Sequence, residues 1–452
     1  MLKKLILIAF AALAAWPLLA SESKTPPAHA PEPPAAAATA FAFPDARDNP
    51  PSGWTGPVFK LSQNYPTTAP TPETYPWKAI DFKTQPMEYL RAVLAYCLEG
   101  NITSAGDFDL HQNTVRKWYH APWMHPNREF IHGMTSERWS RPRELYPSQT
   151  EWWQNWAVGM YNAPGGHAIG RVWANPNSPD PSLARFPDGT VGLKLLFSQA
   201  PVAQVPYLAN SFEWLTDINQ ISKGGAPPVS LRLLQIDVAV RDTRADSTIG
   251  WVFGTFTYDA QEPGSTPWQR LVPIGLMWGN DPTRLFNGQP LRETKINPAL
   301  RMQQHLGYGV GGQKRLNGPV DNPISSCLSC HSTAAVSLDP PRPTISGVTP
   351  ANPTQQQIRT YFRNIPAGTP FSPGYTSLDY SLQLQVGIAL LVSSGGFQPP
   401  GPTPPGPMRA TASSSSARRS AAAASNIIKP MERDGTPPAT TRTRARRPRR
   451  RR

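Results

Sequence analysis

Residues 230–258 read SLRLLQIDVAVRDTRADSTIGWVFGTFTY, and this stretch determines the fold expected for most of the chain. Residues 230–241 and 248–258 are rich in β-branched and aromatic side chains, which favour strands. The polar residues 242–247 between them are typical of a short connection. We therefore expect two neighbouring antiparallel strands.

Other segments of the same region predict further strands. A Pro-Asp-Gly turn signal precedes residues 190–197, and residues 271–278 form another apolar run of strand length. Several long antiparallel strands with aromatic side chains favour a β-sandwich or a half-barrel. Helix is expected only at residues 85–99 and at the aromatic residues 149–160.

One of the three cysteines lies in the first of these helices. Met87, Leu90, Leu94 and Cys97 recur at the three- and four-residue spacing of one helix face. A leftover cysteine in an exported protein can pair between chains or react. Its place on an apolar face instead predicts that Cys97 is buried and inert.

Composition divides the chain into five parts. Of the 14 tryptophans, 13 lie between Trp54 and Trp278 and none follows. We expect an α+β multidomain protein, in which a β-rich, sandwich-like aromatic domain precedes a small all-α domain. The parts are a signal peptide (1–20), a Pro/Ala-rich leader (21–45), the tryptophan-rich domain (46–294), the small domain (295–397) and a Pro/Ser/Arg-rich basic tail (398–452).

The N-terminus is typical of a cleaved secretory signal peptide. Lys3 and Lys4 precede an apolar run, residues 5–19, which ends in small residues. This run is shorter than a membrane span and contains Pro17. No other stretch approaches a spanning length. We expect a mature chain without a transmembrane segment, exported to a bacterial periplasm.

The formal net charge of +14 is concentrated in the tail. Residues 399–452 hold 13 Lys and Arg against 2 acidic residues, whereas residues 21–398 are nearly neutral. No nucleic-acid partner is therefore expected. The composition of the tail predicts disorder, and its arginines are suited to contact acidic surfaces.

The segment Cys327-Leu328-Ser329-Cys330-His331 has the spacing C-x-x-C-H, the attachment signature of a c-type haem. The two thiols can each add to one vinyl group of the porphyrin, and the histidine can then ligate the iron. A thioredoxin-like redox pair does not need the histidine. A zinc site needs further ligands at matching spacing, which do not stand nearby. The motif predicts one covalent haem c.

The residues after the motif favour helices. Residues 353–363 have a polar face of glutamines, and residues 378–394 are broadly apolar and end at two glycines. A haem motif near the start and an apolar helix near the end resemble the class I cytochrome c domain, over about residues 295–397. The resemblance implies two thioether cysteines and a proximal iron ligand, which are Cys327, Cys330 and His331.

The second axial ligand of the iron is not assigned by this resemblance. A class I cytochrome usually supplies a methionine from the loop before its last helix, but residues 332–406 contain no methionine and no histidine. Met302 and His305, upstream of the motif, are candidates for this distal ligand, and Met408 in the tail is a third. Alternatively the position is open, and small molecules can bind the iron there.

Several histidines gather in one part of the larger region. Residues 118–132 read WYHAPWMHPNREFIH, and imidazole suits copper, iron and zinc. The spacing matches no known metal motif, so packing is an alternative to a second metal or an acid–base site. The candidate residues for such a site are His120, His125, Glu129, His132 and, in a predicted loop farther on, His167.

Together these features predict an exported monohaem c-type cytochrome that acts in electron transfer. In one hypothesis it is a haem oxidoreductase, whose large domain binds a small-molecule substrate or a redox partner protein. In the alternative it is an electron relay or interaction protein without enzymatic activity, and the large domain is a docking module. An open or a filled second axial position distinguishes the two.

Overall fold

The computed structural model describes residues 63–122, 129, 131–219, 226–301, 326–339, 341–342, 344–345, 354–393 and 395–396. The expected signal peptide, leader and basic tail lie outside these described residues, and so do His125, Met302, His305 and Met408. Within the described ranges, no helix is both long enough and apolar enough to cross a membrane.

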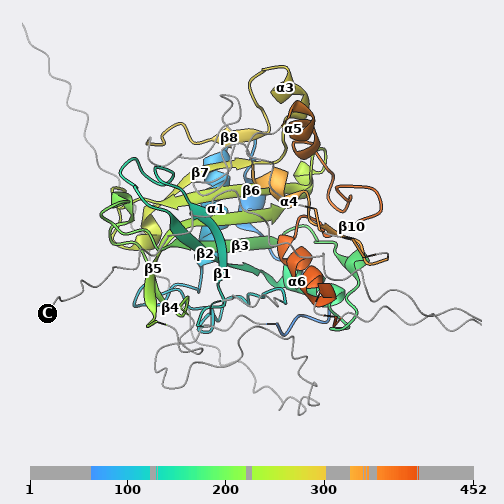
Figure 1. Ribbon diagram of the computed structural model, residues 1–452, viewed down its shortest axis with the longest axis horizontal. Helices are drawn as coiled ribbons and strands as arrows, with labels where there is room; N and C mark the ends of the chain where they lie inside the picture. The colour runs from blue at the N-terminus through green and yellow to red at the C-terminus, as the bar shows by residue number, and fades with distance from the viewer. Residues whose placement is uncertain are drawn as a thin grey trace, which may run out of the picture. The chain divides into compact units, whose positions relative to one another are not determined.

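Eight strands of the described residues form one antiparallel sheet (Figure 1). Across the sheet the order is β1-β2-β3-β5-β6-β7-β8, and the short β4 also pairs with β5. The strands are β1 (Thr135–Ser140), β2 (Trp153–Tyr161), β3 (Val191–Ser198), β4 (Glu213–Thr216), β5 (Val229–Arg241), β6 (Trp251–Tyr258), β7 (Leu271–Met277) and β8 (Thr294–Ile296).

The pairing predicted within residues 230–258 is confirmed. Strands β5 and β6 are antiparallel neighbours, with Ile236 opposite Phe256. The strands predicted at residues 190–197 and 271–278 are also present, as β3 and β7. The fold is therefore α+β with a large antiparallel sheet, as the composition of these segments predicts.

Residues 149–160 contain a strand, so the helix expected there is wrong. Strand β2 pairs with β1 on one side and with β3 on the other, with Val158 opposite Leu195. Its tryptophans and tyrosine favour extended backbone. Hydrogen bonding to a strand on each side then overrides the local spacing of apolar residues that resembled a helix.

A helix covers one face of the sheet, where the sequence led us to expect a second sheet. Helix α1 (Pro86–Leu98) confirms the helix predicted at residues 85–99. Leu90 packs over Gly254 of β6, where an added Cβ would lie 2.2 Å from the Leu90 Cδ2. The glycine lets helix and sheet approach closely. Strands β1 to β8 thus form one sheet, and a helix covers the face where a second sheet of a sandwich would pack.

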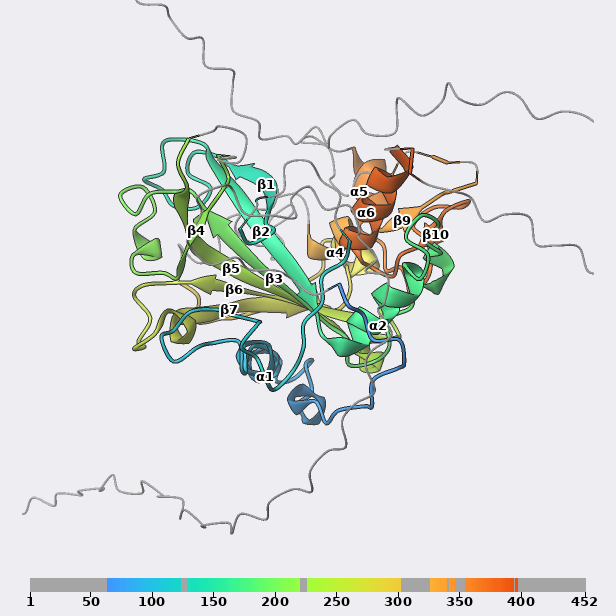
Figure 2. The ribbon, with the colours of Figure 1, turned by 90° about the horizontal axis from the view of Figure 1, so that it is seen from below.

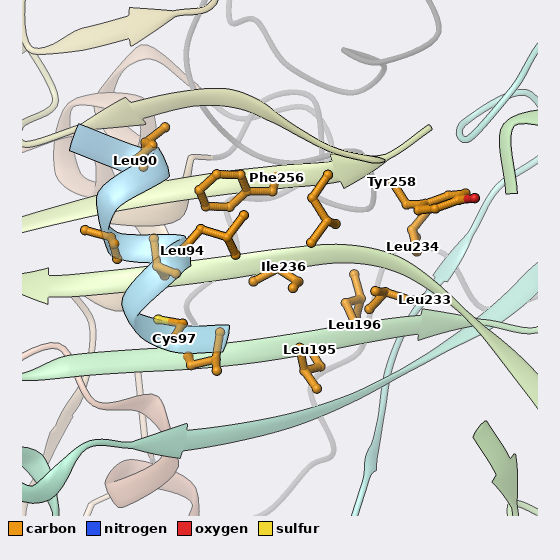
Figure 3. Packing of buried hydrophobic residues seen from close by; sticks show 14 of the residues in the cluster. Leu90, Leu94, Cys97, Leu195, Leu196, Leu233, Leu234, Ile236, Phe256 and Tyr258 are labelled. Carbon is orange, nitrogen blue, oxygen red and sulfur yellow. The ribbon is translucent and has the colours of Figure 1, made fainter. Parts of the chain in front are cut away.

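Cys97 lies inside the core between α1 and the sheet. Figure 3 shows Leu90, Leu94 and Cys97 pointing from α1 toward strand residues such as Ile236 and Phe256. Cys97 is fully buried, and burial raises the pKa of its thiol. A thiol that stays protonated is a poor nucleophile. The prediction of a buried cysteine is confirmed.

The opposite face of the sheet carries a second hydrophobic cluster. Side chains alternate along β6: Val252 and Phe256 belong to the core under α1, whereas Trp251 and Phe253 belong to the second cluster. Residues from both expected domains contribute to the second cluster. Figure 2 shows α1 on one side of the sheet and α4 and α6 on the other. The helices that contribute are α2 (Ala163–Val172), α4 (Cys327–His331) and α6 (Leu382–Ser393).

The described part of residues 295–397 is not all-α as expected. Two short strands, β9 (Ala335–Val336) and β10 (Thr376–Ser377), pair antiparallel between the helices. Residues distant in sequence therefore meet in extended form beside the haem motif. The helix predicted at residues 353–363 is present as α5 (Gln355–Tyr361). The other short elements are α3 (Pro282–Phe286) and the 3-10 helices at Pro76–Ala79, Pro181–Leu183, Pro206–Leu208, Thr243–Ala245 and Pro267–Arg270.

The last helix begins later than its apolar pattern predicts. Helix was expected over residues 378–394, but α6 begins at Leu382. Asp379 and Tyr380 have φ angles of 47° and 70°, in the left-handed region that a right-handed helix excludes. Gly395, with φ of 74°, follows the helix and confirms the predicted glycine stop.

Candidate haem site

The haem motif forms a single helical turn, α4, with a reciprocal cap. The Ser326 Oγ accepts a hydrogen bond from the backbone N–H of Ser329 at 3.1 Å, and the Ser329 Oγ accepts one from the backbone N–H of Ser326 at 2.8 Å. This capping box starts the helix at Cys327. Cys330 and His331 follow Cys327 by three and four positions and therefore lie on the same side of the turn as Cys327.

The two sides of the turn differ in exposure. Leu328 and Ser329 are fully buried, and Leu328 belongs to the second hydrophobic cluster. Cys327, Cys330 and His331 are partly exposed, and neither cysteine is in a disulfide. The inner side anchors the turn to the protein, and the outer side presents two thiols and an imidazole together.

His331 is held in one tautomer by the backbone. Its Nδ1 lies 2.9 Å from the carbonyl oxygen of Tyr380. A carbonyl can only accept a hydrogen bond, so Nδ1 carries the proton and Nε2 keeps its lone pair. Burial of most of the ring lowers the pKa of His331 to about 4. At neutral pH the imidazole is neutral, which is the form that binds a metal ion.

Aromatic side chains from distant elements hold the imidazole in place. The ring centroid of Phe253, on β6, lies 4.9 Å from that of His331, and the Tyr380 ring lies 6.0 Å from Phe253. Neither residue was identified from the sequence. The alternation along β6 indicates only that Phe253 faces away from its neighbour Val252, and no local pattern connects Tyr380 with the haem motif.

The donor set fits a c-type haem. A covalent haem needs two thiols to bond its periphery and an imidazole nitrogen to ligate its iron. The outer face of α4 offers these groups on one turn, with the Nε2 of His331 facing away from the Tyr380 carbonyl. The two upstream candidates for the second axial ligand, Met302 and His305, lie outside the described residues.

A charged group of residues lies on the same face of the sheet as the second cluster. Lys194, Asp237 and Thr255 are directly opposite one another on β3, β5 and β6. The Lys194 Nζ is 3.6 Å from the Glu137 Oε1 and 4.0 Å from the Asp237 Oδ2, and the Thr255 hydroxyl donates to Asp237 at 2.8 Å. Thr255 stands two positions from Phe253 on the same face of β6, and the ring of Phe253 contacts His331, so this group lies on the sheet face that the imidazole packs against.

The other candidate histidines have separate surroundings. The Nδ1 of His120 lies 2.7 Å from the carbonyl oxygen of Gly159. The ring of His132 stacks on Trp214 with centroids 4.2 Å apart, and its Nδ1 lies 3.8 Å from Glu129. No group of three His, Cys, Asp or Glu side chains suited to a metal ion occurs in the part of the chain that the structure describes.

Glu129 is a buried acceptor for backbone groups. Its carboxylate accepts the N–H groups of Ile131 and His132 at 2.7 Å each and that of Asp217 at 2.9 Å. Burial raises the pKa of Glu129, but the interaction with His132 and these N–H groups outweigh it, so the pKa lies below its ordinary value. These contacts join the loop to a distant segment, which supports a packing role.

His167 lies on helix α2 and not in a loop as expected. The helix extends from Ala163 to Val172, and the His167 Nδ1 is 2.9 Å from the carbonyl oxygen of Pro66. The two glycines before His167 suggested a loop, but they allow close packing: an added Cβ at Gly166 would lie 2.5 Å from the ring of Tyr119. The two glycines therefore indicate close packing of a helix at this position and not a loop.

Comparison with protein-family models gives no match for this chain. Comparisons with curated proteins and with solved structures give none either.

Proposed function

We propose that this chain is a monohaem c-type cytochrome, exported to the periplasm, that acts in electron transfer. The proposal rests on one observation: the partly exposed face of α4 presents the thiols of Cys327 and Cys330 beside a neutral His331 whose Nδ1 is already bonded. The resemblance of residues 295–397 to class I cytochromes c supports the same conclusion.

Each residue of the turn has its own task in this proposal. The thiols of Cys327 and Cys330 form thioether bonds to the two vinyl groups, and the Nε2 of His331 is the proximal ligand. The bound haem supplies one-electron chemistry. Leu328 anchors the turn in the second cluster, and the Tyr380 carbonyl keeps the proton on Nδ1. Both contacts hold the ligand in the required orientation.

We further propose that the haem serves an oxidoreductase, in which a small substrate binds beside it. The charged group of Lys194, Glu137 and Asp237 supports this, because polar side chains near a reactive centre orient polar ligands. The lack of methionine and histidine in residues 332–406 supports an open iron position. The alternative is an electron relay with a docking module, in which Met302 or His305 closes the second axial position.

Haem staining on a denaturing gel tests the covalent attachment. The wild-type chain, produced with a c-type haem maturation system, is expected to keep its stain, and the variant Cys327→Ala with Cys330→Ala is expected to lose it. Cys97→Ala is the matched control, because this buried cysteine lies on the other face of the sheet. A wild-type chain without stain, or a double variant with stain, would contradict the proposal.

Carbon monoxide binding tests the choice between enzyme and relay. The reduced protein of an oxidoreductase with an open iron position is expected to bind carbon monoxide at once and to change its visible spectrum. A six-coordinate haem that does not react with carbon monoxide would exclude the open-site enzyme and leave the relay. In that case, replacing Met302 or His305 with alanine is expected to make the iron accessible.

A further inference from the structure

Two successive residues before α6 have a strained backbone. Asp379 and Tyr380 have φ angles of 47° and 70°, and they are the only adjacent non-glycine residues with positive φ among the described residues. The left-handed region costs free energy for residues with a Cβ, less for aspartate than for tyrosine. Such strain persists only where surrounding contacts hold it in place.

The carboxylate of Asp379 makes those contacts with three distant parts of the chain. Its Oδ1 accepts the indole N–H of Trp251 at 3.2 Å and the backbone N–H of Gly368 at 3.1 Å, and its Oδ2 accepts the backbone N–H of Phe186 at 2.9 Å. The side chain is almost completely buried. Burial raises the pKa of Asp379 above its ordinary value, although these N–H groups oppose the rise by favouring the carboxylate.

Tyr380 is held from its other side. Its hydroxyl donates to the carbonyl oxygen of Ile365 at 2.6 Å, and its own carbonyl oxygen accepts from the Nδ1 of His331 at 2.9 Å. The left-handed turn at residues 379–380 sets the direction of this carbonyl. A contact at the carboxylate of Asp379 is therefore transmitted, through one peptide unit, to the iron-ligating histidine.

We propose that Asp379 is a positioning residue for the axial ligand of the haem. By holding residues 379–380 in the left-handed conformation, it aims the Tyr380 carbonyl at the Nδ1 of His331. A strong hydrogen bond from Nδ1 gives the imidazole more negative character, which stabilises ferric over ferrous iron. Asp379 thus lowers the reduction potential of the haem. This inference rests on the proposed function, because it requires a bound haem.

The variant Asp379→Asn tests the inference, because asparagine tolerates the left-handed backbone but replaces one carboxylate oxygen with an NH₂ group, which cannot accept from the N–H donors on that side. The reduction potential is expected to rise. The Nδ1 proton of His331, observed by NMR in the reduced low-spin protein with carbon monoxide added where the iron is open, is expected to exchange about tenfold faster. Asp242→Asn is the matched control: this carboxylate is equally buried but lies beside α1.

Each outcome decides the question. A higher potential with faster exchange supports the positioning role, and an unchanged exchange rate overturns it, because a higher potential alone would reflect only the lost charge. If Asp379→Asn does not bind haem, Trp251→Phe removes one donor and keeps the carboxylate, and it is expected to shift both readouts in the same direction by less. A wild-type chain without haem would overturn the proposed function and this inference with it, whereas a wild-type chain with haem and an unchanged exchange rate in the variant would overturn the inference alone.

Discussion

The two faces of the sheet are formed by the same strands but pack against different parts of the chain. On the face toward α1, Val252 and Phe256 of β6 join a large core that a single helix covers. On the other face, Trp251 and Phe253 join a cluster that is completed by the haem-motif turn, and charged residues follow along the strands. Because side chains alternate along a strand, one face of the sheet can complete a closed core while the other face lines a candidate site.

Two buried aspartates, one on each side of the sheet, differ in the donors that surround them. Asp242, beside α1, accepts from the cations Lys78 and Arg244 and from the hydroxyl of Tyr89. Asp379, on the side of the second cluster, accepts from three neutral N–H groups. The first carboxylate balances charge and stabilises the fold. The second shapes the backbone, and its effect is expected at the ligand.

The largest expected effect comes from truncating one leucine on each face. Leu90→Ala beneath α1 and Leu384→Ala in α6 each remove a fully buried side chain. Each should lower the free energy of unfolding by about 2–5 kcal/mol, because a cavity remains. The same truncations are then made in the variant Cys327→Ala with Cys330→Ala, which should lack haem. There, the loss of unfolding free energy caused by Leu90→Ala should be the same as before, and the loss caused by Leu384→Ala should be smaller. Urea unfolding of the six proteins measures both costs.

The comparison fails if the haem-free background alters both costs equally, because the two faces would then act as one cooperative core. It is sharpened if only the Leu384 cost changes, since haem binding would then stabilise one face of the sheet selectively.

An intermediate effect on stability is expected when Asp242 is protonated at low pH. Burial raises the pKa of Asp242, but Arg244 and Lys78 outweigh it and lower the pKa from 3.8 to about 2. Its contribution, about 1–2 kcal/mol, is therefore present above pH 4 and lost as the pH falls toward 2. Asp242→Asn should remove this dependence in urea unfolding at pH 7, 4 and 2.

Asp246→Asn provides the control for the acid experiment. Asp246 pairs with Arg241 at 2.6 Å, but half of its side chain is exposed, so the pair contributes little. If the two variants lose stability in parallel as the pH falls, the loss belongs to the general charge of the protein and not to the buried carboxylate.

The smallest effect is expected at Lys194, on the side of the second cluster. In the proposed haem protein, a positive charge on this sheet face would favour the reduced iron, so Lys194→Met should lower the reduction potential. The change should correspond to less than about 1 kcal/mol, because the partly exposed charge is screened. Lys194→Arg should keep the wild-type value in a potentiometric titration. A rise in the methionine variant would contradict a location of this charge beside the haem.

Local sequence patterns were sufficient to predict several parts of the fold. The β5–β6 pair follows from two strand-forming runs and a polar connection, and α1 follows from the spacing that ends at Cys97. The motif places two cysteines and a histidine within five positions, and the structure has all five residues in one helical turn. In each case the relevant residues lie within a few positions of one another.

The remainder depends on contacts between distant residues. β2 was misassigned because its partners, β1 and β3, are separate segments that no local spacing reveals. Phe253 and Tyr380 meet His331 only after the sheet and the last helix have assembled. The late start of α6 depends on Asp379, whose partners come from three other parts of the chain.

The burial of Leu328 has a consequence for biogenesis. This residue stands between the two cysteines, and in the finished protein it is enclosed by the second cluster. Once the sheet has closed, only the side of the pentapeptide with Cys327, Cys330 and His331 is partly exposed. Under the proposed function, cofactor attachment at Cys327 and Cys330 should therefore be easier before the final folding of this region than after it.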